Sequence, residues 1–162
     1  MNRKEDDNMN TVSDRIDFNA KKGFICDMDG VIYHGNRILP GAAEFIEWLH
    51  SENKEYLFLT NNSGYTPREL SQKLARMGLD VTEEHFYTSA LATAAFLRDQ
   101  APGCSVFAIG EAGLLNALYD AGITMNDVNP DYVVVGEGRS YSLDTLTKAT
   151  NLVWKGAKLI GA

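Results

Sequence analysis

The sequence predicts an α/β protein with mostly parallel sheets. Short apolar runs alternate with amphipathic segments from about residue 20 to the last residue. The run at 56–59 is continuously apolar, which is typical of a parallel strand covered on both faces. Residues typical of turns and helix caps mark the ends of these segments. A helix is predicted between most neighbouring strands, as in β-α units.

The first half of the chain contains the best-marked helices. After a strand at 23–26, apolar residues recur at helical spacing from Ala42 to Leu49. Thr66, Pro67 and Glu69 form a capping-box pattern that opens a second helix, which Gly78 stops. A short strand is expected at 85–87, and Ser89 is expected to cap a helix over 90–99.

A second set of β-α units follows Pro102 and Gly103. Strands are expected at 105–109, 132–135 and 158–160, and helices at about 114–122 and 143–155. Two of these strands end alike, in the residues IGE at 109–111 and VGE at 135–137. We therefore expect three regions: a flexible arm over 1–19, a core domain over 20–88 and an α/β domain over 89–162.

Composition narrows the choice of partners. The net charge of −7 and the scatter of the 15 basic residues argue against nucleic-acid binding. No apolar run approaches the roughly 20 residues that span a bilayer, and the polar start lacks the apolar centre of a signal peptide. Both cysteines, Cys26 and Cys104, are expected to be free thiols. A cytoplasmic protein with a small-molecule ligand is favoured over a nucleic-acid or membrane partner.

Two carboxylates follow the first strand. Residues 23–30 read GFICDMDG, so Asp27 and Asp29 stand one residue apart at the end of an apolar run. The second apolar run ends at Thr60 and Asn61. Ligands bind outside the carboxyl ends of parallel strands, so all four side chains should face one crevice.

Two neighbouring carboxylates repel each other, but with a bound cation they suit phosphoryl chemistry. A divalent cation such as Mg²⁺ would neutralise Asp27 and Asp29 and would share oxygen ligands with a phosphate. One carboxylate can then attack phosphorus, and the other can act as general acid and base. Gly30 allows the tight turn that brings backbone amides near the anion, and Thr60 offers a hydroxyl group.

These motifs resemble those of a known family. DMDGVI followed by LFLTNNSG resembles the first two motifs of the haloacid dehalogenase superfamily. DMDGVIYHGNRILPGAAEFI, FYTSALATAAFL and NPDYVVVGEGRSYSLDTL resemble its NagD-type branch, subfamily IIA. The resemblance implies a Rossmann-like parallel core, an inserted α/β cap of the C2 type, and Mg²⁺-dependent hydrolysis of small phosphomonoesters such as nucleotide or sugar phosphates.

The resemblance also implies residue roles. Asp27 is the expected nucleophile, and Asp29 is the expected acid/base, with its backbone carbonyl on the metal. Thr60 and Asn61 are expected to hold the phosphate. The family's third-motif lysine and fourth-motif acidic pair are expected beyond residue 162, so core and cap are both expected to be incomplete and this chain alone inactive or nearly so.

Several alternatives stay open at this stage. The same aspartyl-phosphate serves phosphotransferases such as phosphomutases, and a strand-end aspartate also serves non-catalytic phosphoacceptor or phospho-ligand modules. Asp27 and Asp29 could be solvated turn residues, and Thr60 and Asn61 could merely cap a strand end. Arg139 could meet a substrate anion or form a surface ion pair.

Two further expectations concern the surface. His34 lies in a turn-like segment without a metal-ligand partner at the right spacing, so an exposed histidine is expected. An incomplete core would leave an open sheet edge and apolar surface, which should promote association of copies into a homo-oligomer.

Overall fold

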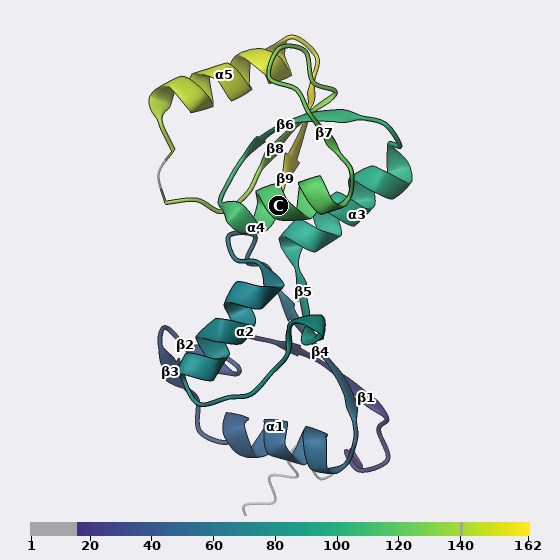
Figure 1. The fold of residues 1–162 in the computed structure, drawn as a ribbon, viewed down its shortest axis with the longest axis vertical. Helices are drawn as coiled ribbons and strands as arrows, with labels where there is room; N and C mark the ends of the chain where they lie inside the picture. The colour runs from purple at the N-terminus through teal and green to yellow at the C-terminus, as the bar shows by residue number, and fades with distance from the viewer. Residues whose placement is uncertain (1–15, 140) are drawn as a thin grey trace, which may run out of the picture.

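The structure is a computed structural model that describes residues 16–139 and 141–162. Most of the expected arm over 1–19 lies outside the described residues. Two lobes follow one another along the long axis of the molecule (Figure 1). The N-terminal lobe is built on a three-stranded sheet and the C-terminal lobe on a four-stranded sheet, and every strand pair in both sheets is parallel.

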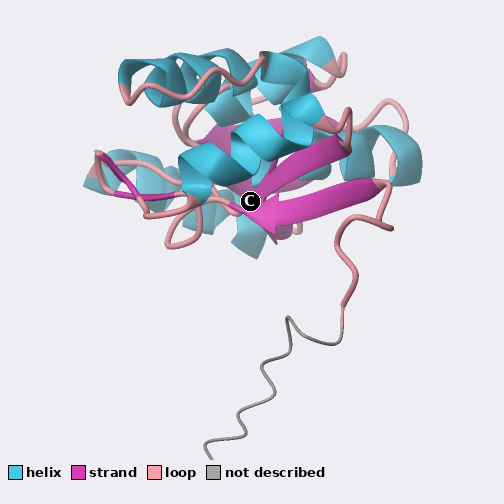
Figure 2. Ribbon diagram, turned by 90° about the horizontal axis from the view of Figure 1, so that it is seen from below, coloured by secondary structure: helices cyan, strands magenta, loops and turns pink. Residues whose placement is uncertain are grey.

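The N-terminal lobe places its helices on one face of the sheet β1-β4-β5. Its elements are β1 (Gly23–Asp27), β2 (Tyr33–His34), β3 (Arg37–Ile38), α1 (Ala42–Ser51), β4 (Glu55–Thr60), α2 (Pro67–Arg76), η2 (Glu83–His85) and β5 (Phe86–Thr88). Phe58 of β4 is fully buried, together with Leu49 of α1 and Leu74 of α2. Figure 2 is viewed from the end of this lobe and shows helices along one side of its strands.

The other face of this sheet is uncovered by the described residues. Ile25 is 74% exposed and Leu59 is 46% exposed, although both are large apolar side chains. Side chains alternate between the two faces of a strand, so this apolar set is opposite the buried set that includes Phe58. The prediction that the strand at 56–59 is covered on both faces is therefore wrong for the part of the chain that the structure describes.

The C-terminal lobe has three layers around the sheet β7-β6-β8-β9. Its elements are α3 (Ser89–Gln100), β6 (Ser105–Ile109), α4 (Ala112–Asp120), β7 (Thr124–Met125), β8 (Tyr132–Val135), α5 (Leu143–Trp154) and β9 (Lys158–Gly161). One core cluster joins α3 and α4 to the sheet through Leu97, Leu114 and Val134. A second cluster joins α5 to the sheet through Leu152 and Val133.

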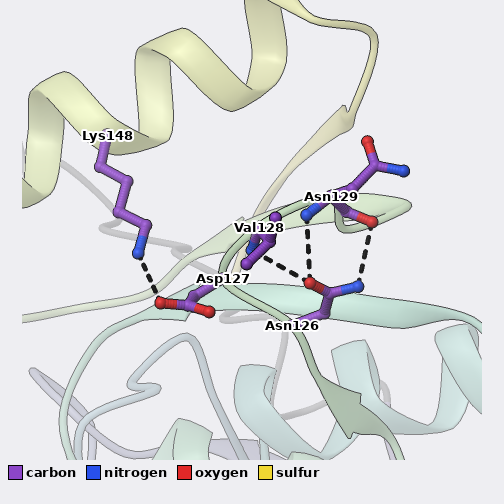
Figure 3. A network of polar contacts seen from close by, with 5 residues as sticks. All are labelled: Asn126, Asp127, Val128, Asn129 and Lys148. Atoms are coloured by element: carbon purple, nitrogen blue, oxygen red, sulfur yellow. Dashed lines mark hydrogen bonds and ion pairs between the residues drawn. The ribbon is translucent and has the colours of Figure 1, made fainter.

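The connection between β7 and β8 contains a polar turn (Figure 3). The Asn126 side-chain oxygen accepts hydrogen bonds from the amides of Val128, at 3.0 Å, and Asn129, at 3.1 Å. Lys148 of α5 donates to Asp127 of the same turn at 2.7 Å. This exposed pair lowers the pKa of the Asp127 carboxyl, first through the hydrogen bond from Lys148, and ties α5 to the turn.

Most predicted elements are present, with corrections at their ends. The capping box of Thr66 and Glu69 forms as expected. Thr88 caps α3, whereas Ser89, the predicted cap, is the first helical residue and its hydroxyl donates to Asn61 O at 2.9 Å. The hairpin β2-β3 and the short strand β7 were not predicted.

Both cysteines are free, as expected. Within 16–139 and 141–162, no helix has the length and apolar character needed to cross a bilayer.

We expect Phe58→Ala to destabilise the N-terminal lobe strongly. Phe58 has no exposed surface and packs beside the rings of Tyr56 and Phe86, so its removal leaves a cavity that costs about 3–5 kcal/mol. Urea unfolding followed by far-ultraviolet circular dichroism measures the change. Tyr119→Ala is the control, because that side chain is 79% exposed. Equal unfolding midpoints for the two variants would contradict this account of the core.

Candidate functional site

The polar ends of β1 and β4 lie side by side. Asp27 is the last residue of β1 and pairs in register with Leu59. Thr60, the last residue of β4, comes next and pairs with Thr88 of β5. The parallel sheet therefore places Asp27 and Thr60 at the same edge, as the sequence predicts. Asp27 is exposed and Thr60 is only 7% exposed.

A tight turn follows Asp27. Its carboxylate accepts a hydrogen bond from the Met28 amide at 2.7 Å. The Met28 carbonyl in turn accepts from the amides of Val31, Ile32 and Tyr33, at 3.3, 2.9 and 3.3 Å. Gly30 has φ of 80°, a left-handed value that glycine adopts without strain. Its N–H donates to Tyr33 O at 2.8 Å, so this amide is already paired.

The loop after Thr60 is shaped by its own side chains. The Thr60 hydroxyl accepts from the Asn62 amide at 3.1 Å. The Asn62 side-chain oxygen accepts from the amides of Gly64 and Tyr65, at 3.1 and 2.9 Å. These hydrogen bonds from backbone amides to nearby side chains stabilise a turn, because the amides beyond Thr60 have no partners in the sheet. The Asn61 side chain remains exposed beside this turn.

The same loop joins the two lobes. Ser63 is fully buried, and its hydroxyl accepts from the Glu137 amide at 2.6 Å. The Asn62 side-chain nitrogen donates to the Glu137 carboxylate at 2.5 Å. The Gly113 amide, at the start of α4, donates to Gly64 O at 3.0 Å. We call residues 61–65 the junction loop, because it contacts both lobes.

A cleft of about 620 Å³ opens between the lobes at this junction. Its size falls in the range of small-molecule sites. The N-terminal lobe and junction loop contribute Asp29, Tyr33, Gly35, Thr60, Asn61, Asn62, Tyr65 and Lys73; the C-terminal lobe contributes Val135, Gly136, Glu137, Arg139 and Ala162.

The cleft gathers four of the six predicted site residues. Asp29, Thr60, Asn61 and Arg139 line it, while Asp27 and Gly30, which are within two residues of Asp29 in the chain, are outside the lining. Asp27 lies on the uncovered face of the sheet, together with Ile25, by the alternation of side chains along β1.

Burial and nearby acidic groups both affect Tyr33 in this cleft. Burial, and next the Asp29 carboxylate, raise the pKa of the Tyr33 phenol above its usual value, with further contributions from Tyr65, Asp27 and Glu137. His34 is exposed, as predicted, and its ring nitrogen lies 3.6 Å from Asp29, where it forms an ion pair when protonated.

Arg139 enters the cleft from the loop after β8. Its backbone amide donates to the Glu111 carboxylate at 3.1 Å. Among the described residues its side chain forms no ion pair, so the alternative of a surface ion pair finds no support there.

The carboxylates fit a magnesium ion that keeps several water ligands. Asp27 and Asp29 supply hard oxygen donors and are both exposed, and Mg²⁺ commonly binds through one or two carboxylates together with water and phosphate. In the part of the chain that the structure describes, no group of three or more histidine, cysteine or acidic residues forms a candidate metal site. Any site here would depend on this carboxylate pair.

Sequence reasoning missed Lys73, Glu137 and Asn62 as cleft residues. The repeated strand endings were a partial signal for Glu137, because β6 pairs with β8 and the Glu111 amide donates to Glu137 O at 3.2 Å. Lys73 and Asn62 gave no signal, since their positions depend on how α2 and the junction loop pack.

Comparisons with known proteins agree on one family. The family described as haloacid dehalogenase-like hydrolase matches residues 24–124. The chain is 46% identical over 139 residues to ribonucleotide monophosphatase NagD of Escherichia coli K12, covering 86% of this chain and 55% of the relative. It is 44% identical over 137 residues to dihydroxyacetone phosphatase of Corynebacterium glutamicum, covering 85% and 50%.

Solved structures give the same result. NagD from Escherichia coli K-12 superposes with a TM-score of 0.81 at 46% identity, over 86% of this chain and 56% of that chain. A 4-nitrophenylphosphatase from Thermotoga maritima superposes with a TM-score of 0.81 at 34% identity, over 88% and 55%. The chain thus spans about half the length of the relatives that it matches.

We expect Gly113→Ala to loosen the contact between the lobes. A Cβ atom at this position would lie 2.6 Å from Ser63 O and from the Tyr65 backbone, so α4 or the junction loop must move. Overpacking of this kind costs about 1–3 kcal/mol. Thermal unfolding and hydrogen exchange of the Glu137 amide measure the effect. Gly161→Ala is the control, because its added Cβ would have no atom within 4 Å apart from those of Gly161 itself and its chain neighbours. Faster exchange in both variants or in neither would contradict the account.

Proposed function

Because the chain belongs to the haloacid dehalogenase-like hydrolases, we propose that it carries part of the active site of a phosphomonoester hydrolase acting on small phosphorylated metabolites. The observation that supports this most is the pairing of β1 with β4, which puts Asp27 and Thr60 at one sheet edge beside the cleft. The names of two relatives, a ribonucleotide monophosphatase and a dihydroxyacetone phosphatase, favour nucleotide or sugar phosphates as substrates.

In the proposed reaction Asp27 is the nucleophile. A carboxylate oxygen of Asp27 forms a bond to phosphorus while the ester P–O bond breaks, and the leaving oxygen takes a proton from Asp29. Asp29 then accepts a proton from water, whose oxygen attacks phosphorus and displaces Asp27. The products are free alcohol and inorganic phosphate, and both carboxyl groups return to their starting states.

The other cleft residues position the phosphoryl group. The Thr60 hydroxyl accepts one hydrogen bond from the Asn62 amide, which leaves its proton available to a phosphate oxygen. The exposed Asn61 side chain offers an amide donor. Gly30, although outside the cleft lining, contributes the turn after β1, and Arg139 brings a guanidinium group from the C-terminal lobe.

Mg²⁺ is part of the proposal. Asp27 would hold it through its carboxylate and Asp29 through its backbone carbonyl, and its charge would offset that of the Asp27 carboxylate and stabilise negative charge on the phosphoryl oxygens. We also propose that residues 20–88 are the core, that residues 89–162 are the cap, and that the protein works in the cytoplasm.

The first test needs no turnover. Beryllium trifluoride is a stable mimic of a phosphoryl group on a carboxylate. We expect ¹⁹F nuclear magnetic resonance to show a Mg²⁺-dependent adduct with the full chain and with Asp29→Asn, and none with Asp27→Asn, because only Asp27 is the acceptor. An adduct that persists in Asp27→Asn would overturn the assignment of the nucleophile.

The second test is hydrolysis of an aryl phosphate. Because this chain alone is expected to be inactive or nearly so, we expect at most residual Mg²⁺-dependent release of phosphate, which Asp27→Asn abolishes and Asp29→Asn lowers by about 10²-fold, since Asp29 supplies the proton. Transfer of the group to an added sugar hydroxyl would instead indicate a phosphotransferase. A stable phosphorylated chain without release would indicate a phosphoacceptor module.

A further inference from the structure

Lys73 is a cation that the proposed reaction does not use. It lies on α2 between Leu70, which is 1% exposed, and Leu74, which is fully buried. Its own side chain is half-buried and lines the cleft. Buried leucines thus stand at neighbouring positions of the helix, three residues before Lys73 and one after it, and the Lys73 side chain lines the cleft.

Two aromatic rings hold this ammonium group. The Lys73 nitrogen is 4.0 Å from the centroid of the Tyr33 ring and 5.7 Å from that of the Tyr65 ring. Cations bind to such ring faces, with larger energies where water is partly excluded. The contact restricts the rotamers of a flexible side chain in advance, so less entropy is lost when a ligand binds.

The charge of Lys73 has no carboxylate partner in the described chain. Ion pairs within 4.0 Å join His34 to Asp29, Arg98 to Asp99, and Lys148 to Asp127, and none involves Lys73. Tyrosine rings attract a cation but do not neutralise it. A positive charge held in a cleft of small-molecule size, which Thr60 and Asn61 also line, is therefore available to an anion.

We propose that Lys73 is a substrate-binding residue that holds negatively charged oxygens of a phosphate or phosphomonoester in this cleft. Arg139 lines the same cleft from the other lobe, so an anion there would meet a cation from each side. The proposal rests on the proposed function for the identity of the ligand, and it assigns a role to a residue of α2. A purely structural role, bracing the hairpin β2-β3 against α2, is the competing explanation.

Calorimetric titration of the full chain with inorganic phosphate at low salt tests the proposal. We expect Lys73→Met to weaken phosphate binding about tenfold, because a charge-assisted bond is lost while the packing on the rings is kept. Lys73→Arg should stay within about threefold. Lys158→Met is the control, because the Lys158 nitrogen also lies over a tyrosine ring, 5.6 Å from the centroid of Tyr132, but outside this cleft.

Thermal unfolding of each variant separates binding from bracing. A structural role alone predicts a lower melting temperature for Lys73→Met with unchanged phosphate affinity, and that result overturns the proposal. So does the absence of phosphate binding by the unmodified chain at millimolar concentrations.

The two proposals fail separately. Asp27-dependent hydrolysis with the same KM and phosphate affinity in Lys73→Met leaves the function standing and removes the role of Lys73. Lys73-dependent phosphate binding without an Asp27 adduct supports Lys73 and removes the proposed chemistry.

Discussion

The parallel pairing of β1 with β4 is the constraint on which the rest of the site depends. Phe58 and Thr60 share the buried face of β4, whereas Asp27 follows Ile25 on the uncovered face of β1. A shift of one residue in either strand would exchange its faces and expose its packed set. Burial of Phe58 against α1 and α2 thus fixes the register, and the register fixes the positions of Asp27 and Thr60 on opposite faces at the same end of the sheet.

The junction loop connects the polar end of this sheet to the C-terminal lobe. Ser63 is a buried hydroxyl that satisfies the Glu137 amide, and an unpaired buried donor there would cost about 1–3 kcal/mol. Gly113 and Gly136 lack the side chains that would collide with this loop. The lobes are joined by close backbone packing and short polar contacts, so the position of Glu137 at the cleft follows from that of Ser63.

The sequence determines some of these features more directly than others. The continuous apolar runs and the capping box of Thr66 and Glu69 are local signals, and they predicted most strands and helices. The hairpin β2-β3 and β7 have only two residues per strand, too few for a periodic pattern. Asp27 and Thr60 could be placed because strand ends of a parallel sheet share an edge. Lys73 could not, since its place in the cleft depends on how α2 packs against Tyr33. The residue roles stay predictions.

Charge links the ligand and the metal in this site. When Asp29 holds the proton that it gives to the leaving group, Asp27 and Glu137 bring two negative charges to the cleft and the strand end beside it, against the two positive charges of Lys73 and Arg139. A phosphate dianion alone would leave a net negative charge in the site, and Mg²⁺ alone would leave a net positive charge. Bound together they leave the net charge unchanged, so each lowers the electrostatic cost of binding the other. Because Glu137 and Arg139 come from the C-terminal lobe and the other three from the N-terminal lobe, that coupling depends on the junction loop that holds the lobes in place.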